Sequence, residues 1–268
     1  MKTELDPRYR AILQTVEDYC LDHENPAIVS KYARYFREGY DAYGLVDEEI
    51  HALCDKVLAD HPLSMEEYAE VGWHLFATGR YEFASIAILL LESCKESYNQ
   101  STFNWVKKWL DNGVVNWAHC DIICSRLTPV FIEKGIITLI DLVPWRESDS
   151  RWTRRAVPVT LLTLRKTADP EELLAFIDSM MTEKERVVHQ GLGWFLRELW
   201  KLHPQPVEEF LFKHKQQCDR LIIQYATEKM KDDKKKRFRR DKPEKPKNFK
   251  QGSPKPAKPK KAEKKIHE

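Results

Sequence analysis

Four residues near the middle of the chain carry side chains that could bind nucleic acid and act on it: Trp117, Asp121, Arg155 and Trp194. They fall near the starts of three successive segments with helical periodicity. Trp117 and Asp121 are four positions apart, so a helix over residues 115–127 places the carboxylate directly beside the indole. Aromatic and arginine side chains grouped with one acid suit an anionic, partly apolar ligand such as nucleic acid.

The segment GLGWFLRELW supports this interpretation of Trp194. Its large apolar side chains share one helical face: Leu192, Phe195, Leu196 and Leu199. Trp194, Arg197 and Lys201 fall together on the opposite face. A tryptophan that packs in a core would lie among the leucines, so we expect Trp194 to face a ligand.

The net charge of +2 conceals three regions of different charge. Residues 1–149 hold 14 Lys and Arg against 25 Asp and Glu, whereas residues 150–230 hold 13 against 11. Residues 231–268 hold 17 against 6. We therefore expect a DNA-binding surface to be built mainly from the second half and the tail. The acidic half is also typical of a solvated outer face.

Composition predicts a soluble protein with a substantial core. The chain has 268 residues, of which 42% are hydrophobic. Its first ten residues carry no secretory signal, and the longest apolar run, residues 84–91, is too short to span a bilayer. We therefore expect no membrane association and a cytoplasmic, nucleoid-associated location.

The six cysteines do not suggest disulfides in that compartment. Cys120 and Cys124 share one helical stripe with Ile123 and Leu127, and we predict that they are small core residues. His119 lies nearby, but the chain has no C-x-x-C pair and no second cluster at zinc spacing. We therefore predict neither a metal nor a cofactor.

Helical periodicity predicts an all-α fold. The clearest 3.6-residue patterns lie in residues 8–23, 47–61, 64–79, 82–98 and 170–185. Short links that contain Gly, Asn or Pro separate these segments, and no alternating strand of useful length occurs. About a dozen helices with short links favour an α-solenoid over a single bundle.

From residue 231 the composition becomes rich in Lys and Pro and poor in aliphatic residues. Such a segment cannot bury enough surface to fold alone, so we divide the chain into a folded domain at 1–230 and a disordered basic tail at 231–268. The cations of the tail could bind nucleic acid, with Phe238 and Phe249 available for stacking. A tail that only raises solubility is the alternative.

Three stretches of the chain resemble the signature regions of the AlkD/AlkC-type DNA alkylation repair glycosylases. In order, they are NWAHCDIIC, SRWTRRAVP and HQGLGWFLRELWKLHP, and further matches lie around Tyr35, around Arg80 and Glu82, and in TFNWVKKWLDN. The resemblance covers residues 8–228. It implies an α-solenoid of HEAT-like repeats that holds duplex DNA on its concave face.

The resemblance also implies a reaction, the hydrolysis of the N-glycosidic bond of 3- or 7-alkylated purines by a DNA glycosylase. It assigns catalysis to Asp121, Trp117 and Trp194. The carboxylate would oppose positive charge on the sugar and position a water, and the indoles would face the same developing cation. On the residues alone, Asp121 could instead pair within the helical array.

Five residues are expected to contact DNA. Arg155 would bind a phosphate bidentately, and Arg197 is a second phosphate ligand. Arg154 is adjacent to Arg155 and faces another direction, so one of the two is a surface charge. Tyr35 matches a family position near DNA, although a tyrosine packed between helices is an equal alternative. Lys201 completes the polar face of its helix.

Two residues depart from the family pattern. Asn116 stands where many members have a tryptophan, although it can cap a helix, and Pro158 interrupts the segment that carries Arg155. Two other functions stay open: a non-catalytic solenoid that recognises distorted duplex DNA, and a HEAT-type protein-binding scaffold. For the glycosylase, the expected partner is double-stranded DNA with alkylated bases, bound by a monomer.

Overall fold

The structure is a computed structural model that describes residues 5–240, and every regular element in this range is helical. This confirms the all-α fold. The α-helices are α1 (Pro7–Asp22), α2 (Pro26–Ala33), α3 (Asp47–Asp60), α4 (Met65–Ala77), α5 (Tyr81–Ser93), α6 (Gln100–Asn112), α7 (Trp117–Arg126), α8 (Thr128–Glu133), α9 (Val143–Arg146), α10 (Arg151–Leu164), α11 (Pro170–Ile177), α12 (Arg186–Trp200), α13 (Pro204–His214), α14 (Arg220–Ala226) and α15 (Asp232–Arg237). Short 3₁₀ helices cover Lys95–Ser97, Leu139–Leu142 and Asp178–Thr182.

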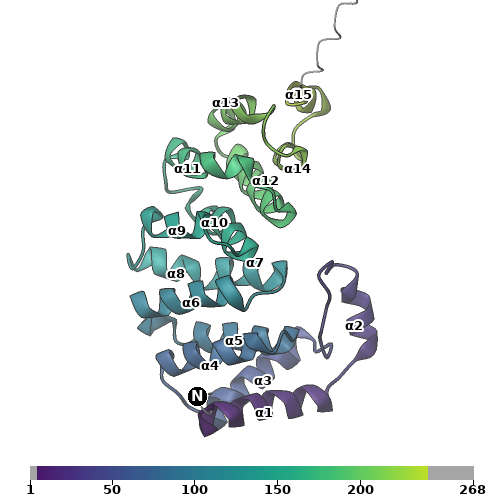
Figure 1. Cartoon of the computed structure of the whole chain (residues 1–268), viewed down its shortest axis with the longest axis vertical. Helices are drawn as coiled ribbons and strands as arrows, with labels where there is room; N and C mark the ends of the chain where they lie inside the picture. The colour runs from purple at the N-terminus through teal and green to yellow at the C-terminus, as the bar shows by residue number, and fades with distance from the viewer. Residues whose placement is uncertain (1–4, 241–268) are drawn as a thin grey trace, which may run out of the picture.

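The helices stack as a curved solenoid of two layers (Figure 1). The inner layer consists of α5, α7, α10, α12 and α14, each packed on the next. The outer layer contains α4, α6, α9, α11 and α13. Side chains that pair between neighbouring inner helices are 32 to 35 positions apart in sequence, which falls within the range of solenoid repeats.

One segment leaves this stack. Residues 25–45, here called the arm, contain α2 and cross to the side of the solenoid on which α7 begins (Figure 1). The ends of the arm are joined by a hydrogen bond from the Asn25 amide to the Tyr43 carbonyl, 2.8 Å long. The arm therefore departs from the stack and returns to it at almost the same place.

Capping side chains fix where the inner helices begin. The Asn116 side chain accepts a hydrogen bond from the His119 amide, Ser150 accepts from the amides of Trp152 and Thr153, and Asp219 caps α14 in the same way. Each cap satisfies amides that have no partner within the first turn. The expected capping role of Asn116 is confirmed.

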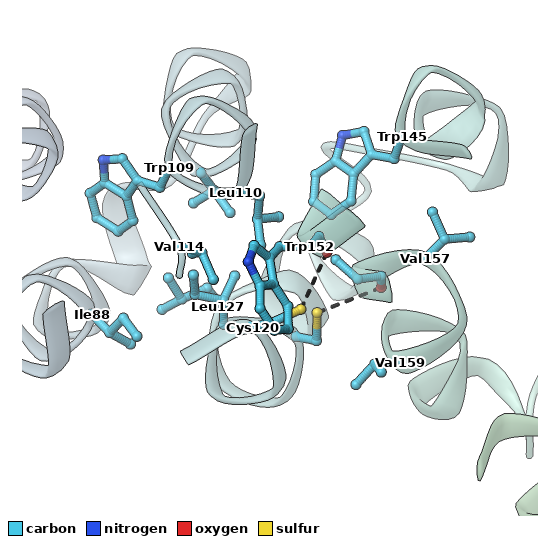
Figure 2. Packing of buried hydrophobic residues seen from close by; sticks show 14 of the residues in the cluster. Ile88, Trp109, Leu110, Val114, Cys120, Leu127, Trp145, Trp152, Val157 and Val159 are labelled. Atoms are coloured by element: carbon cyan, nitrogen blue, oxygen red, sulfur yellow. Dashed lines mark hydrogen bonds between the residues drawn. The ribbon is translucent and has the colours of Figure 1, made fainter. Parts of the chain in front are cut away.

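Tryptophans fill the space between the layers. Trp109 and Trp145 are fully buried, and Trp152 lies beside Cys120 in the same core (Figure 2). The Cys120 thiol donates to the Trp152 carbonyl and the Cys124 thiol to the Ala156 carbonyl, at 3.3 and 3.5 Å. Both cysteines are therefore core residues, as predicted.

Two glycines let α12 approach its neighbours. A methyl group on Gly193 would lie 2.4 Å from the Tyr225 Cβ and 2.9 Å from the Ile222 carbonyl oxygen of α14. One on Gly191 would lie 3.3 Å from Pro158 of α10. In the GLGW sequence, Gly191 therefore faces α10 and Gly193 faces α14.

The fold continues past the predicted domain boundary at residue 230. α15 follows directly, and Phe238 is 1% exposed with its ring 4.6 Å from that of Phe212 in α13. The expectation that Phe238 stacks on nucleic acid is therefore wrong, because its ring belongs to the core. Residues 231–240 of the predicted tail are therefore part of the described fold, and the rest of it, with Phe249, lies outside the described residues.

Within residues 5–240, no helix has both the length and the apolar character needed to cross a membrane.

Candidate functional site

A groove of about 580 Å³ lies between the arm and the inner layer of the solenoid. Its walls come from the arm, α7, α10, α12 and α14: Arg34, Tyr35, Arg37, Glu38, Trp117, Asp121, Arg151, Arg155, Glu185, Arg186, Val187, Gln190, Trp194, Arg197 and Tyr225. Six of these residues are arginines and three are acids, so the groove is suited to an anionic ligand.

The repeat places equivalent positions of successive helices side by side along the groove. Asp121, Arg155 and Gln190 are each the fifth residue of their helices, α7, α10 and α12. The row continues into α14, where the Tyr225 hydroxyl accepts a 2.9 Å hydrogen bond from the Gln190 amide. A carboxylate, a guanidinium and an amide therefore lie next to one another, because the three helices begin at equivalent positions of successive repeats.

A second row lies one turn closer to the helix N-termini. Trp117, Arg151 and Arg186 are the first residues of α7, α10 and α12. Arg186 is exposed, and the ion pairs of Arg151 with Glu38 and Glu185 are long, both 3.9 Å. This row presents cations at the mouth of the groove, where weak partners leave them available to a ligand.

Asp121 and Arg155 form a bidentate ion pair at the centre of the groove. Arg155 donates from Nε to Asp121 Oδ1 at 2.9 Å and from Nη2 to Oδ2 at 2.7 Å. The Arg155 side chain is 6% exposed and that of Asp121 is 16% exposed. Burial raises the pKa of the Asp121 carboxyl above its usual range, while the hydrogen bonds and charge of Arg155 oppose that rise.

The predicted role of Arg155 does not agree with this geometry. Its third nitrogen, Nη1, donates to the Val187 carbonyl oxygen at 2.6 Å, so each nitrogen of the guanidinium already has a protein acceptor. A group that is engaged and buried in this way is poorly placed to bind a phosphate. Its observed contacts fix the orientation of Asp121 instead.

Trp117 connects the solenoid to the tip of the arm. Its ring, in a residue that is 38% exposed, stacks on Phe36 with centroids 5.6 Å apart, and its Nε1 donates to the Tyr35 carbonyl at 3.1 Å. Tyr35 itself is 53% exposed and lines the groove, so it is not packed between helices. One face of the indole is thus used to hold the arm in place.

Glu82 of α5 holds the base of the arm. Its buried carboxylate accepts hydrogen bonds from the backbone amides of Tyr43, Gly44 and Leu45, at 3.0, 2.8 and 3.3 Å. Gly44 has φ of +89°, and a Cβ there would lie 2.4 Å from the Asn25 carbonyl oxygen, so only glycine fits. Burial raises the pKa of Glu82, while these backbone bonds oppose the rise.

The other predicted residues divide between the groove and its surroundings. Trp194 is half-buried and lines the groove beside Arg197, which is paired with Glu198 and Glu228. Lys201 binds Glu198 and does not line the groove.

Arg154 also lies outside the groove lining. Its Nε donates to Glu183 at 2.6 Å, and its Nη1 donates to the carbonyls of Ser148 and Asp149. Of the two adjacent arginines, Arg154 is therefore the one that stabilises the loops around Ser148 and Glu183.

Sequence reasoning missed several groove residues: Arg34, Arg37, Arg151, Arg186, Gln190 and Tyr225. Two of them, Arg34 and Arg37, lie in the half of the chain whose acidic balance argued against DNA contact. The available signal was local, because KYARYFR at residues 31–37 alternates cations with aromatic residues.

No group of three or more His, Cys, Asp or Glu side chains within residues 5–240 is arranged to hold a metal ion.

Comparison with known proteins agrees with this architecture. Residues 21–230 match the model of a protein family described as DNA alkylation repair enzyme. A solved structure, a predicted DNA alkylation repair enzyme from Enterococcus faecalis, superposes with a TM-score of 0.67 at 18% identity, covering 78% of this chain and 98% of that one. No curated protein matches the chain. A family model that spans most of the chain identifies it as a member of the DNA alkylation repair enzyme family.

Proposed function

We propose that the protein is a DNA glycosylase that releases 3- or 7-alkylated purines from duplex DNA. The observation that carries the proposal is the Asp121 carboxylate, oriented by Arg155 in an arginine-lined groove and flanked by Trp117 and Trp194. Membership in the DNA alkylation repair enzyme family supports a role in repair. The bond to be broken is the one that the resemblance to the alkylation repair glycosylases implies, and this side-chain set is suited to breaking it.

An alkylated purine that carries a positive charge is a good leaving group. When the bond between its nitrogen and the sugar C1′ breaks, the electron pair leaves with the base and positive charge develops on the sugar. The Asp121 carboxylate stabilises that charge and accepts a proton from the water that attacks C1′. The indole faces of Trp117 and Trp194 stabilise the same cation through cation–π interactions.

The groove also accounts for binding of the DNA backbone. Arg34, Arg37 and Arg186 are exposed at its rim, where arginine can bind phosphate oxygens. Each phosphate that is neutralised releases condensed counterions, so duplex affinity should fall steeply as salt rises. The family resemblance further implies that the DNA is held from its backbone side.

One observation favours a second function, the recognition of distorted duplex DNA without catalysis. Both oxygens of Asp121 accept hydrogen bonds from Arg155, and this pairing opposes protonation of the carboxylate that general-base catalysis would require. If the pair persists on DNA, Asp121 would only maintain the groove. The two functions differ in whether the base leaves.

A base-release assay tests the proposal. Duplex DNA treated with a methylating agent is incubated with the full chain, and free alkylpurine is measured by chromatography, with undamaged duplex as the control. The glycosylase predicts release from the methylated duplex only. Salt-dependent binding to both duplexes without release would establish the passive binder instead. Absence of any duplex binding would leave a protein scaffold.

A further inference from the structure

A second basic surface lies beyond the groove, between α14 and α15. This surface, the α14–α15 cleft, is lined by eleven residues, among them Lys215, Arg220, Lys235, Arg239 and Arg240, with Asp219 as the one acid. The family match ends at residue 230, before α15, so four of the eleven lining residues come from outside the matched region.

Two faces of the basic α15 segment serve different purposes. On one face, Lys234 forms an ion pair with Glu208 of α13, the Arg237 guanidinium lies 5.2 Å from the ring centroid of Phe212, and Phe238 enters the core. These contacts fix α15 on the solenoid. Lys235 in α15 and Arg239 just after it line the cleft.

Three cations of the cleft, Arg220, Lys235 and Arg239, have weak or no acidic partners among the described residues. Within residues 5–240, neither Arg220 nor Arg239 has a hydrogen bond or an ion pair with an acidic side chain, and the ion pair of Lys235 with Asp232 is 3.7 Å long. Arg240 donates to the Cys218 carbonyl at 2.6 Å, which holds the end of the described chain beside α14. Arg220 and Arg239 are therefore suited to bind a polyanion.

The cleft and the groove both border α14. Tyr225 of this helix lines the groove, while Leu221 and Gln224 line the cleft. A duplex carries one negative charge for about every 1.7 Å of its axis, so DNA in the groove presents phosphates to whatever lies past α14. The cleft places Arg220 of α14, and the cations Lys235, Arg239 and Arg240 that follow α14 in sequence, on this part of the surface.

We propose that the α14–α15 cleft binds the sugar–phosphate backbone of duplex DNA beyond the site where the base is released. The proposal rests on the proposed function only for the position of the lesion, because backbone binding needs no damaged base. Arg220 and Arg239 are the principal phosphate ligands. Nucleic-acid binding, which composition predicted for the whole tail, would thus involve the folded residues of α15 and the two positions that line the cleft after it.

The test is a double substitution in the full chain, Arg220→Gln with Arg239→Gln. Its matched control is Lys231→Gln with Lys236→Gln, which removes the same charge from exposed positions beside the cleft that do not line it. Affinity for a fluorescent undamaged duplex is measured across a salt series. Thermal melts establish that both variants are folded, and single-turnover base release at saturating protein is measured in parallel.

The cleft variant should lose about 0.9 in the log–log salt slope for each phosphate contact, or about 1.8 in total. The control variant should keep both the salt slope and the single-turnover rate of the unmodified protein. Equal slopes for the two variants would overturn the proposal. So would an unchanged duplex slope together with lost binding of polyglutamate, which would assign the cleft to an acidic protein.

Failure of the cleft and failure of the proposed function give different results. If the unmodified protein releases no base but the slopes differ as expected, the cleft stands and the glycosylase does not. If base is released and the slopes are equal, the glycosylase stands and the cleft does not.

Discussion

The carboxylate of Asp121 and the guanidinium of Arg155, 34 positions apart in sequence, meet through two parallel hydrogen bonds in the most buried part of the groove. The pair gives Asp121 a fixed direction, which a carboxylate on an isolated helix face would lack. It also makes the candidate catalytic group part of the packing between α7 and α10. Activity and stability are therefore coupled at this pair.

Asp121→Asn should reduce base release by about a hundredfold or more, because the amide neither opposes positive charge on the sugar nor accepts a proton. It should also lower the free energy of unfolding by about 3 kcal/mol, since it leaves the Arg155 charge buried without its partner. Chemical denaturation and single-turnover assays measure the two effects.

A double variant separates the effect of Asp121→Asn on activity from its effect on stability. Asp121→Asn with Arg155→Met should be more stable than Asp121→Asn alone and equally inactive. If the double variant recovered activity, Asp121 would not be the catalytic group.

The pH dependence of base release should report Asp121. Because burial raises its pKa, the rate should fall as the pH is lowered through a value above the usual range for aspartate. Arg155→Met removes the group that opposes this rise, so the acidic limb should move to higher pH. A profile of the single-turnover rate, corrected for spontaneous base loss, measures the shift. An acidic limb that stays in place would mean that another group titrates.

Trp194→Ala and Leu196→Ala should differ in their effects although the residues are two positions apart. Leu196 is fully buried, so its truncation should cost roughly 2 to 5 kcal/mol of stability. Trp194 is half-buried on the groove, so its truncation should cost less stability and more activity. Thermal melts and base-release rates compare them. If Trp194→Ala melts as early as Leu196→Ala, the indole is a packing residue.

Gly193→Ala and Gly191→Ala form a second pair. Alanine is favoured over glycine in a helix by about 1 kcal/mol, and the methyl group at Gly191 meets neighbours at 3.3 Å or more. That variant should be close to neutral. At Gly193 the methyl group would force α14 outward, at a cost of about 1 to 3 kcal/mol. Denaturation midpoints that rank the two in the opposite order would contradict the assigned packing.

Truncation should depend on where the chain is cut. Removing residues 241–268 should leave the melting temperature unchanged and reduce the salt slope of duplex binding. Removing residues 231–268 should also cost about 3 kcal/mol or more, because it takes the buried Phe238 ring from the core. Equal melting temperatures for the two truncations would show that α15 adds no stability.

Helical periodicity predicted the elements of the stack because each helix buries one face, and the same pattern placed Trp194 on the groove. The partner of Arg155 could not be predicted in this way. The pairing depends on α7 and α10 starting in step, and the repeats share too few residues to be aligned by inspection. The resemblance therefore suggested an arginine free to bind phosphate, and the residues alone indicated only that Asp121 could pair within the array.

Averaging over long windows explains the other errors. The acidic balance of residues 1–149 concealed Arg34 and Arg37, which the arm brings to the groove from outside the stack. The Lys-rich composition after residue 230 concealed Phe238, a single aromatic side chain that fixes a short helix. In both cases a few local contacts outweigh the composition of their surroundings.

The arm behaves as a span supported at two points, Glu82 beneath its base and Trp117 at its tip. Arg34, Arg37 and Tyr35 lie between these supports, so a defect at either one displaces all three together. A substitution at Glu82, buried in the core and absent from the groove lining, would consequently resemble a DNA-contact mutant in a genetic screen. Mapping such variants by distance from the ligand alone would misassign them.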